Sequence, residues 1–356
     1  MSVHQYTELS PNSGASHQAE IIPLRPQNEG VINNREIGAL PVYSSVMDSS
    51  NNRLLSQGRS DGFHWHIERQ QTDDGIAFDV GYFEPEVRRS DVALYIDTSW
   101  TTQVKGLNSH TASIAARLGM PSIVKGPEIG SSIPLSHSAH NTHALMDAVE
   151  NEGFAEKGIA VHKGFSRGAM IGLGVNAYAE QFNRTMLYAE EDDPCLAHSI
   201  FDVSPEEIVD YAQYVPKEIA TTLLKIGRIV MDPRRVRYYH RTIDVSGRGF
   251  KQIVQTGMPL FSGEAGLLAD HVSQDAFMNI AFQKGMPANH RNDFTDRLSG
   301  RPGVMVSELE GTHTGAIGRK GSGEFILRIV GLIDQIDEGV PTDQIDFTKV
   351  HLPSAA

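Results

Sequence analysis

The sequence predicts an α/β protein whose sheet is mostly parallel and begins with an antiparallel hairpin. From Asp91 onward, short apolar runs alternate with longer stretches of helical character, which is typical of parallel strands joined by crossover helices. Ahead of them, Phe63–Ile67 and Ile76–Tyr82 are β-rich runs separated by Thr72–Gly75. The Asp-Gly pair in that separator indicates a hairpin.

Six apolar runs are the predicted strands that follow, because near-continuous hydrophobicity suits a sheet covered on both faces. They are Val92–Ile96, Pro121–Lys125, Ile159–Lys163, Thr185–Ala189, Met258–Ser262 and Val304–Leu309. The stretches between them predict helices at Ser109–Leu118, His140–Glu152, Arg167–Phe182, Ser273–Gln283 and Gly323–Ile336. Several of these helices are followed by a glycine, as helix ends often are.

Composition divides the chain into three parts. Residues 1–60 are rich in Ser, Asn, Gln, Pro and Gly without a sustained apolar period, which predicts a flexible N-terminal arm. The compact domain is expected at residues 61–340, followed by a C-terminal tail at 341–356. Within the domain, residues 198–250 interrupt the alternation with mainly helical character, which predicts a helical cap inserted over the sheet.

Charge and composition exclude several classes of function. With 44 acidic and 31 basic residues, the formal net charge is −13, whereas nucleic-acid affinity comes mainly from Lys and Arg. We therefore expect no nucleic-acid partner. The single cysteine, Cys195, excludes an intrachain disulfide and a cysteine-based zinc site, and no motif for a metal or cofactor is present. The chain has no apolar run of about 18 residues, and Met1–Asn12 does not resemble a signal peptide, so we expect a cytoplasmic protein without a membrane span.

Two G-x-S-x-G strings occur, and their context separates them. Gly58–Gly62 follows a polar stretch and precedes a strand, which indicates a turn. Gly164–Gly168 follows the predicted strand Ile159–Lys163 directly and opens the helical stretch that begins at Arg167. A serine on such a strand-to-helix turn presents its hydroxyl above the edge of the sheet. Ser166 is therefore the predicted nucleophile.

The neighbours of Ser166 suit the same chemistry. Gly164 and Gly168 lack the side chains that would collide on a sharp turn. The backbone N–H of Arg167 would lie at a helix N-terminus, where it can donate to a developing oxyanion.

A serine hydroxyl needs a base, usually a histidine that is oriented by a carboxylate. Among the 15 histidines, His313 is best placed, because it follows the predicted strand Val304–Leu309 within the loop Glu310–Gly315. A loop at the carboxyl end of that strand can bring the imidazole over the sheet edge that carries Ser166. His313 is the predicted general base.

From about Phe63 to about Ile336 the chain resembles the α/β-hydrolase family. The resemblance rests on the elbow around Ser166, on the order of Ser166 before His313, on the antiparallel hairpin, and on the insertion before the last two strands. In that family the acid of the triad commonly follows the penultimate strand, predicted here at Met258–Ser262. The resemblance thus points to Glu264 or Asp270, with Gly266 at the usual position. A less common arrangement would take the acid from the run Glu190, Glu191, Asp192 and Asp193.

The resemblance also implies a second oxyanion donor, from the loop after Val92–Ile96. This loop begins Asp97-Thr98-Ser99-Trp100 and lacks the family's His-Gly or glycine run, so Thr98 or Ser99 is the predicted donor.

The predicted function is a serine hydrolase that cleaves a carboxylic ester of a small-molecule acyl substrate through an acyl-enzyme. Acyl transfer or amide cleavage on the same triad, and a catalytically silent binding module of the same fold, are the alternatives. The substrate's identity and the oligomeric state do not follow from the sequence.

Overall fold

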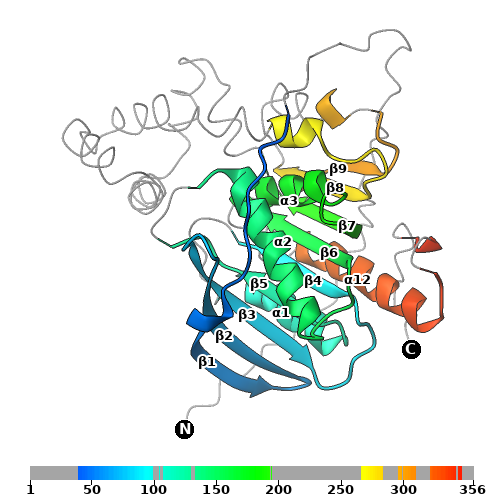
Figure 1. Ribbon diagram of the computed structural model, residues 1–356. Coiled ribbons are helices and arrows are strands. Elements are labelled where there is room, and N and C mark those ends of the chain that lie inside the picture. Colours follow the sequence, from blue (N-terminus) through cyan, green and yellow to red (C-terminus); the bar gives the residue numbers. More distant parts are fainter. Residues whose placement is uncertain are drawn as a thin grey trace, which may run out of the picture.

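The computed structural model describes residues 39–98, 104, 107–129, 133–192, 194, 266–283, 296–298, 300–309, 321–341 and 344–346. Within them, one sheet has the strand order β1-β2-β3-β5-β4-β6-β7-β8-β9 (Figure 1). The strands are β1 (Arg53–Ser60), β2 (Phe63–Gln71), β3 (Ala77–Pro85), β4 (Ala93–Asp97), β5 (Ser122–Lys125), β6 (Ile159–Phe165), β7 (Thr185–Asp192), β8 (Met278–Gln283) and β9 (Val304–Leu309). The helices are η1 (Ser49–Asn51), α1 (Leu107–Arg117), α2 (Leu135–Asn151), α3 (Arg167–Tyr178) and α12 (Gly321–Asp337).

The pairing confirms the predicted mixture of antiparallel and parallel strands. β2 and β3 form the expected hairpin, in which Phe63 lies opposite Pro85 and Gln71 lies opposite Ala77. From β5 through β4, β6, β7 and β8 to β9 every pair is parallel. The carboxyl ends of these six strands therefore lie along one edge of the sheet.

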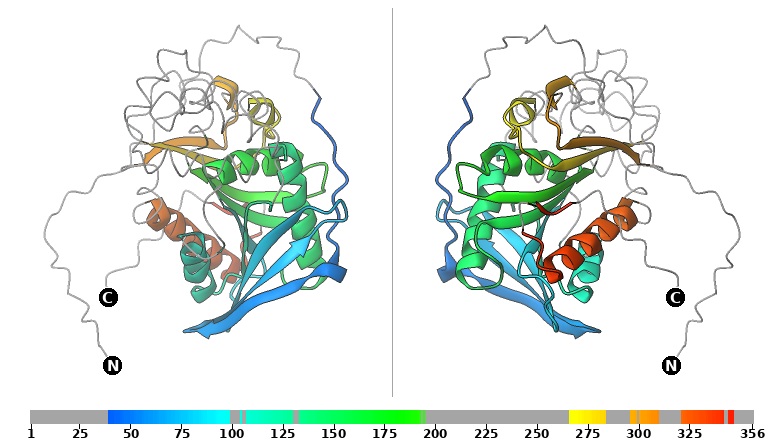
Figure 2. Two further views of the ribbon diagram at one scale, coloured as in Figure 1. Left: turned by 90° about the vertical axis from the view of Figure 1, so that its left-hand side faces the viewer. Right: turned by 90° about the vertical axis from the view of Figure 1, so that its right-hand side faces the viewer.

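Helices cover both faces of the sheet, as the apolar runs predicted. Successive side chains of a strand point to opposite faces, and β6 shows the division. Ala160 packs in an apolar cluster with α2 and α3, whereas Val161 packs in a second cluster with α1 and α12. Figure 2 shows these helix pairs on opposite sides of the sheet.

The sheet begins earlier than the sequence indicated. β1 lies within the predicted N-terminal arm, yet it pairs antiparallel with β2 from Arg53 to Ser60. The first G-x-S-x-G string, expected to be a turn, is one only in its second part: Gly58, Arg59 and Ser60 pair with β2 as the end of β1, and Asp61 and Gly62, with Gly62 at φ +83°, form the turn. The polar composition of β1 reflects its place at the sheet edge, where one side is open to solvent.

Ahead of β1, residues 39–48 cross the outer surface of α2 as an extended strap (Figure 1). The Tyr43 ring stacks on His137 at a centroid distance of 4.3 Å, and it meets the His140 ring edge-on at 5.5 Å. The Tyr178 hydroxyl donates a hydrogen bond to the Pro41 carbonyl at 2.7 Å. The strap is thereby joined to both helices of this face.

One predicted helix is wrong. Residues Ser273–Gln283 were expected to be helical, but Ser273–Ala276 form a turn and Met278–Gln283 is strand β8, which is parallel to β7 and β9. The strand that precedes β9 in the chain is thus β8. The run Met258–Ser262 and the predicted cap at 198–250 lie outside the described residues. Among the described helices, none has the length and apolar character needed to cross a membrane.

Candidate active site

Ser166 occupies a strained turn between β6 and α3, at the carboxyl edge of the parallel strands. Its backbone has φ 56° and ψ −115°, a combination that costs a residue with a side chain of order 1–3 kcal/mol. Its N–H donates to the Asp192 carbonyl at 2.9 Å, which joins the turn to the end of β7. Strain of this kind persists only where the surrounding structure imposes it, and it is common at catalytic sites.

Two glycines make room for this turn. A Cβ added at Gly164 would lie under 3.0 Å from the Gly168 carbonyl, and one at Gly168 would lie under 3.0 Å from the Asp97 carbonyl. The first contact closes the turn on itself, and the second sets the start of α3 directly against the end of β4. The structure thus confirms the steric role that the sequence assigned to both glycines.

Because Ser166 is strained, its replacement by glycine should give a more stable protein than its replacement by alanine, the reverse of the usual order. Glycine adopts positive φ without penalty, so Ser166→Gly should relieve strain that Ser166→Ala retains. We expect the glycine variant to be more stable to urea than the alanine variant by about 1 kcal/mol or more. In ordinary strand or helix positions glycine is the less stable by about 0.5–1 kcal/mol. Equal stabilities would show that residue 166 is not strained.

Arg167 is the first residue of α3, so its N–H belongs to the helix N-terminus, where backbone N–H groups and the helix dipole favour negative charge. Its side chain is buried and is held from two sides. Nη2 lies 2.9 Å from Glu128 Oε2 and donates to the Ser138 hydroxyl at 2.6 Å. The sequence predicted a role for the N–H alone, because nothing local to Arg167 indicates Glu128 or Ser138.

Thr98, one of the two predicted oxyanion donors, directly follows β4. Its backbone N–H donates to the Lys125 carbonyl at 3.1 Å, so this group is used in the pairing of β4 with β5. The Thr98 hydroxyl is buried and has no hydrogen-bond partner among the described residues. Thr98 can therefore offer a substrate its hydroxyl but not its N–H. Ser99, the other predicted donor, lies outside the described residues.

The acidic run after the predicted strand Thr185–Ala189 belongs to β7 and is buried. Glu190 Oε2 lies 2.7 Å from Arg328 Nη1, and Asp192 Oδ2 lies 2.7 Å from Lys163 Nζ. Glu191 Oε1 lies 2.8 Å from His162 Nδ1. Each of these three carboxylates thus has a cationic or imidazole partner inside the fold, whereas Asp193 lies outside the described residues.

Asp270 lies at the wrong edge of the sheet for a triad. Its carboxylate pairs with Arg297 Nη1 at 2.7 Å, and its carbonyl accepts from Arg301 Nη2 at 2.9 Å. Arg301 precedes β9, at the amino ends of the parallel strands. A strand of six residues spans about 20 Å, which separates this edge from the one that carries Ser166. Glu264 and His313 lie outside the described residues.

Beneath the Ser166 turn, His162 is fully buried between two carboxylates. Nε2 lies 3.1 Å from Asp97 Oδ2, and Nδ1 lies 2.8 Å from Glu191 Oε1. Burial alone would lower the pKa of His162, but the charges of Glu191 and Asp97 outweigh burial and raise its pKa to about 9. Burial also raises the pKa of Glu191, to about 7, because His162 offsets only part of that effect. Because the pKa of His162 and the pKa of Glu191 are both raised, the pair binds its proton more tightly than the free side chains would. This proton lies between strands β6 and β7.

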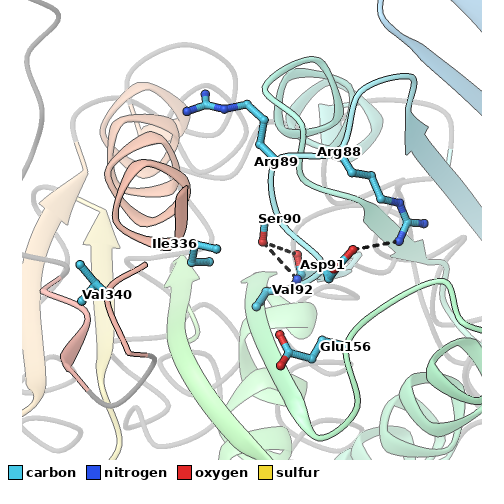
Figure 3. A pocket seen from close by; sticks show the side chains of 8 residues that line it. All are labelled: Arg88, Arg89, Ser90, Asp91, Val92, Glu156, Ile336 and Val340. Carbon is cyan, nitrogen blue, oxygen red and sulfur yellow. Dashed lines mark hydrogen bonds and ion pairs between the residues drawn. The ribbon is translucent and has the colours of Figure 1, made fainter. Parts of the chain in front are cut away.

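A cavity of about 340 Å³ opens elsewhere (Figure 3). Its lining includes Val92, which precedes β4, and Glu156, which precedes β6, so it lies at the amino ends of these strands. Arg88 pairs there with Asp91, and Arg89 pairs with Asp334 and Asp337. The remaining lining residues are Ser90, Ile336 and Val340. The cavity is separate from Ser166.

In the described part of the chain, no group of three or more His, Cys, Asp or Glu side chains is arranged to hold a metal ion.

Comparison with known proteins finds similarity in structure but not in sequence. No protein-family model and no curated protein matches the chain. The esterase Pf2001 of Pyrococcus furiosus is similar at a TM-score of 0.52 and 11% identity, over 82% of this chain and 100% of that chain. An esterase of Pyrobaculum calidifontis reaches 0.50 at 11% identity, over 75% and 85%. DcsB, solved in complex with its substrate analogue, reaches 0.50 at 12% identity, over 76% and 98%. At these identities, the similarity concerns the fold alone.

Proposed function

We propose that this protein, which has the α/β-hydrolase fold, is a serine hydrolase that cleaves a carboxylic ester through Ser166. The observation that carries the proposal is the backbone of Ser166. It is strained, it joins β6 to α3 at the carboxyl edge of the sheet, and it is followed at once by the helix N-terminus at Arg167. This arrangement presents a hydroxyl beside an N–H donor, the two groups that acyl transfer requires first.

In this reaction Ser166 Oγ attacks the ester carbonyl while His313 accepts the hydroxyl proton. The carbonyl oxygen becomes an oxyanion, which the Arg167 N–H stabilises together with the Thr98 hydroxyl or a donor from Ser99. Collapse of the intermediate expels the alcohol, which takes the proton from His313 and leaves an acyl-enzyme. Water then attacks this ester with the same base, and the acid is released.

The position of β9 supports His313 as the base. β9 ends at Leu309, on the edge that carries Ser166, and β9 lies three strands from β6 in the sheet. Three strand spacings amount to about 14 Å. The four residues from Leu309 to His313 can span up to about 14 Å when extended, and the side chain adds to that reach.

The position of β8 changes the candidates for the acid. Because β8 precedes β9, the family's usual place for the acid is the segment after Gln283, where Asp293 is the first carboxylate. Glu264 remains the candidate from the sequence. Asp270 is not retained, because it lies at the opposite edge of the sheet. We favour Asp293 over Glu264 on the strand order.

A fluorophosphonate probe tests the nucleophile, since it reacts with activated serines and needs no knowledge of the substrate. We expect the probe to label the wild-type protein and to leave Ser166→Ala unlabelled, with Ser60→Ala, in the first G-x-S-x-G string, as the labelled control. Labelling that persists in a folded Ser166→Ala protein would remove Ser166 from the proposal. The same assay on Asp293→Asn and Glu264→Gln identifies the acid as the residue whose loss slows labelling.

Hydrolysis of short p-nitrophenyl esters tests the bond that is cleaved. Two of the three similar structures are named as esterases, so an ester is the first substrate class to test. Release of the free acid supports hydrolysis, whereas product formation only with an added alcohol or amine acceptor supports acyl transfer. The use of the Thr98 N–H within the sheet favours one other function, a catalytically silent binding module. Absence of both labelling and ester turnover in folded wild-type protein would support that alternative.

A further inference from the structure

The central strands carry a row of buried charges of alternating sign. Lys125 Nζ on β5 lies 3.1 Å from Asp97 Oδ1 on β4. The other oxygen of this carboxylate, Asp97 Oδ2, lies 3.1 Å from His162 Nε2 on β6. His162 lies 2.8 Å from Glu191 on β7. These strands are neighbours in the order β5-β4-β6-β7 (Figure 1). All four side chains are buried and point to the face covered by α2 and α3. We call this row, together with Glu128 and Arg167, the charge ladder.

The ladder extends beyond β5 to the residue that follows the nucleophile. Lys125 Nζ donates to Glu128 Oε1 at 2.9 Å, and Glu128 Oε2 lies 2.9 Å from Arg167 Nη2. Burial favours a protonated Glu128, but Arg167 and Lys125 outweigh burial and hold its pKa below the usual range. Glu128 is thus a buried carboxylate shared between two buried cations.

Both ends of the ladder meet the Ser166 turn. One end is Arg167 itself. At the other end, Glu191 occupies the niche that Gly164 and Gly172 leave, since a Cβ at either glycine would lie under 3.0 Å from its carboxylate oxygens. The turn is therefore held from the position after the serine and from the position two before it.

Stability alone does not account for so many buried charges. Desolvation of a buried ion pair offsets most of its Coulombic gain, and well-packed apolar residues are often as stable or more stable. Ion pairs do, however, fix the relative position of the groups that they join. At this place they join the ends of β4 and β5 to the first residue of α3.

We propose that Glu128 is a positioning residue for catalysis, which holds the Arg167 guanidinium and thereby sets the Arg167 N–H at the oxyanion. This inference rests on the proposed function. Arg167 has little freedom between its side-chain anchor and the strained turn, so release of the anchor lets the first turn of α3 relax. A displacement of 1 Å in a reacting group can cost about 100-fold in rate.

The test compares Glu128→Gln with a matched control, Glu150→Gln. Glu150 is also a buried carboxylate that pairs with an arginine, Arg184, but it lies beside Gly158 at the opposite edge of the sheet. We expect Glu128→Gln to lower kcat for a p-nitrophenyl ester by about 10- to 100-fold, with KM changed less than about twofold. Glu150→Gln should keep kcat within about twofold. A kcat for Glu128→Gln near that of the control would overturn the proposal.

A second variant covers the case in which Glu128→Gln does not fold. Ser138→Ala removes the other anchor of Arg167 and changes no charge, so we expect a smaller fall in kcat, again at constant KM. Unchanged kcat in Ser138→Ala, with no folded Glu128→Gln protein, also counts against the proposal.

A double-mutant cycle then asks whether Glu128 acts through Arg167. In an Arg167→Gln background, Glu128→Gln should lower kcat by less than about threefold, because the link is already broken. If the effects of Glu128→Gln and Arg167→Gln on the free energy of activation were fully additive, Glu128 would act independently of Arg167. Failure of this inference remains distinct from failure of the proposed function. In the first case Ser166→Ala is inactive while Glu128→Gln is normal, and in the second Ser166→Ala keeps its activity or the wild type has none.

Discussion

Alanine at position 168 is expected to lower the free energy of unfolding by more than about 4 kcal/mol, a large fraction of the roughly 5–15 kcal/mol that stabilises a typical folded protein. The reason is the contact between α3 and β4. A Cβ at residue 168 would lie under 3.0 Å from both the carbonyl carbon and the carbonyl oxygen of Asp97. These are backbone atoms, so no side-chain rotation can relieve the collision. Displacement of Asp97 would also pull its carboxylate away from Lys125 and His162.

Urea denaturation followed by circular dichroism measures this effect, with Gly174→Ala in the same helix as the control. The collision at Gly174 is milder, because a Cβ there would lie 2.8 Å from the Cβ of Ala139, farther than a Cβ at Gly168 would lie from the Asp97 oxygen, and alanine is the better helix former by about 1 kcal/mol. We expect a much smaller loss for Gly174→Ala than for Gly168→Ala. Similar stabilities for the two variants would mean that α3 does not approach β4 as closely as described.

Stability is also expected to fall by about 3 kcal/mol as the pH rises from 6.5 to 9, because His162 binds its proton more tightly in the folded state. The ordinary pKa of histidine is about 6.5, and in the fold the pKa of His162 is raised to about 9. A raised pKa stabilises fully below the unfolded value and loses that contribution as the pH passes the folded value. A tenfold change in proton affinity corresponds to about 1.36 kcal/mol. The raised pKa of Glu191 acts in the same direction, mainly between pH 4.5 and 7.

Neutralising the pair should remove this dependence. We expect the double variant His162→Gln/Glu191→Gln to have nearly constant stability between pH 6.5 and 9, because the titrating pair is gone and Asp97 keeps its partner Lys125. His143 on α2 also faces His162, but burial lowers the pKa of His143 to about 3, so it stays neutral in this range.

The single variant His162→Gln should behave differently. It leaves Glu191 without its imidazole partner and Asp97 with one fewer, so we expect a loss of about 3–5 kcal/mol at pH 6.5. Urea titrations at pH 6.5, 7.5 and 9 on the wild type and both variants measure these effects. A wild-type protein that is equally stable at pH 6.5 and 9 would show that His162 does not carry the extra proton.

The sequence predicted the strand-to-helix turn at Ser166 because its signal is local. A glycine-flanked serine between an apolar run and a helical stretch involves only neighbouring residues, and the structure places Ser166 in the expected turn. The hairpin was found for the same reason, and so were five of the six predicted strands after it, with β9 at the predicted bounds. Local pattern was thus sufficient wherever one segment alone decides the conformation.

β8 was missed because its pattern is ambiguous. Met278–Gln283 is a short apolar run, and such a run fits a buried strand as well as a buried helix segment. Ser273 begins the predicted helix, but the Asp275 N–H donates to its hydroxyl and the Ala276 N–H donates to its carbonyl, which together close a turn. The error matters for the site, because the strand order decides which segment leads from the sheet towards the triad acid.

The buried charge pairs of β7 were not predictable from one sequence. Glu190, Glu191 and Asp192 resemble a solvated acidic loop, yet their partners are Arg328, His162 and Lys163. These partners lie 29 or more positions away and become neighbours only in the folded structure. Charges in a predicted buried strand were the available signal, since buried charges require partners.

The strap at residues 39–48 limits how far the N-terminal part of the chain can be shortened before buried side chains become exposed. Tyr43 and Pro41 seal an aromatic surface on α2 and α3, where His140 and Tyr178 are completely buried. A shortened protein that started at β1 would keep all the described strands, but the His140 and Tyr178 rings would be exposed to solvent. The strap therefore shields the packing of α2 and α3, although it contributes no strand to the sheet.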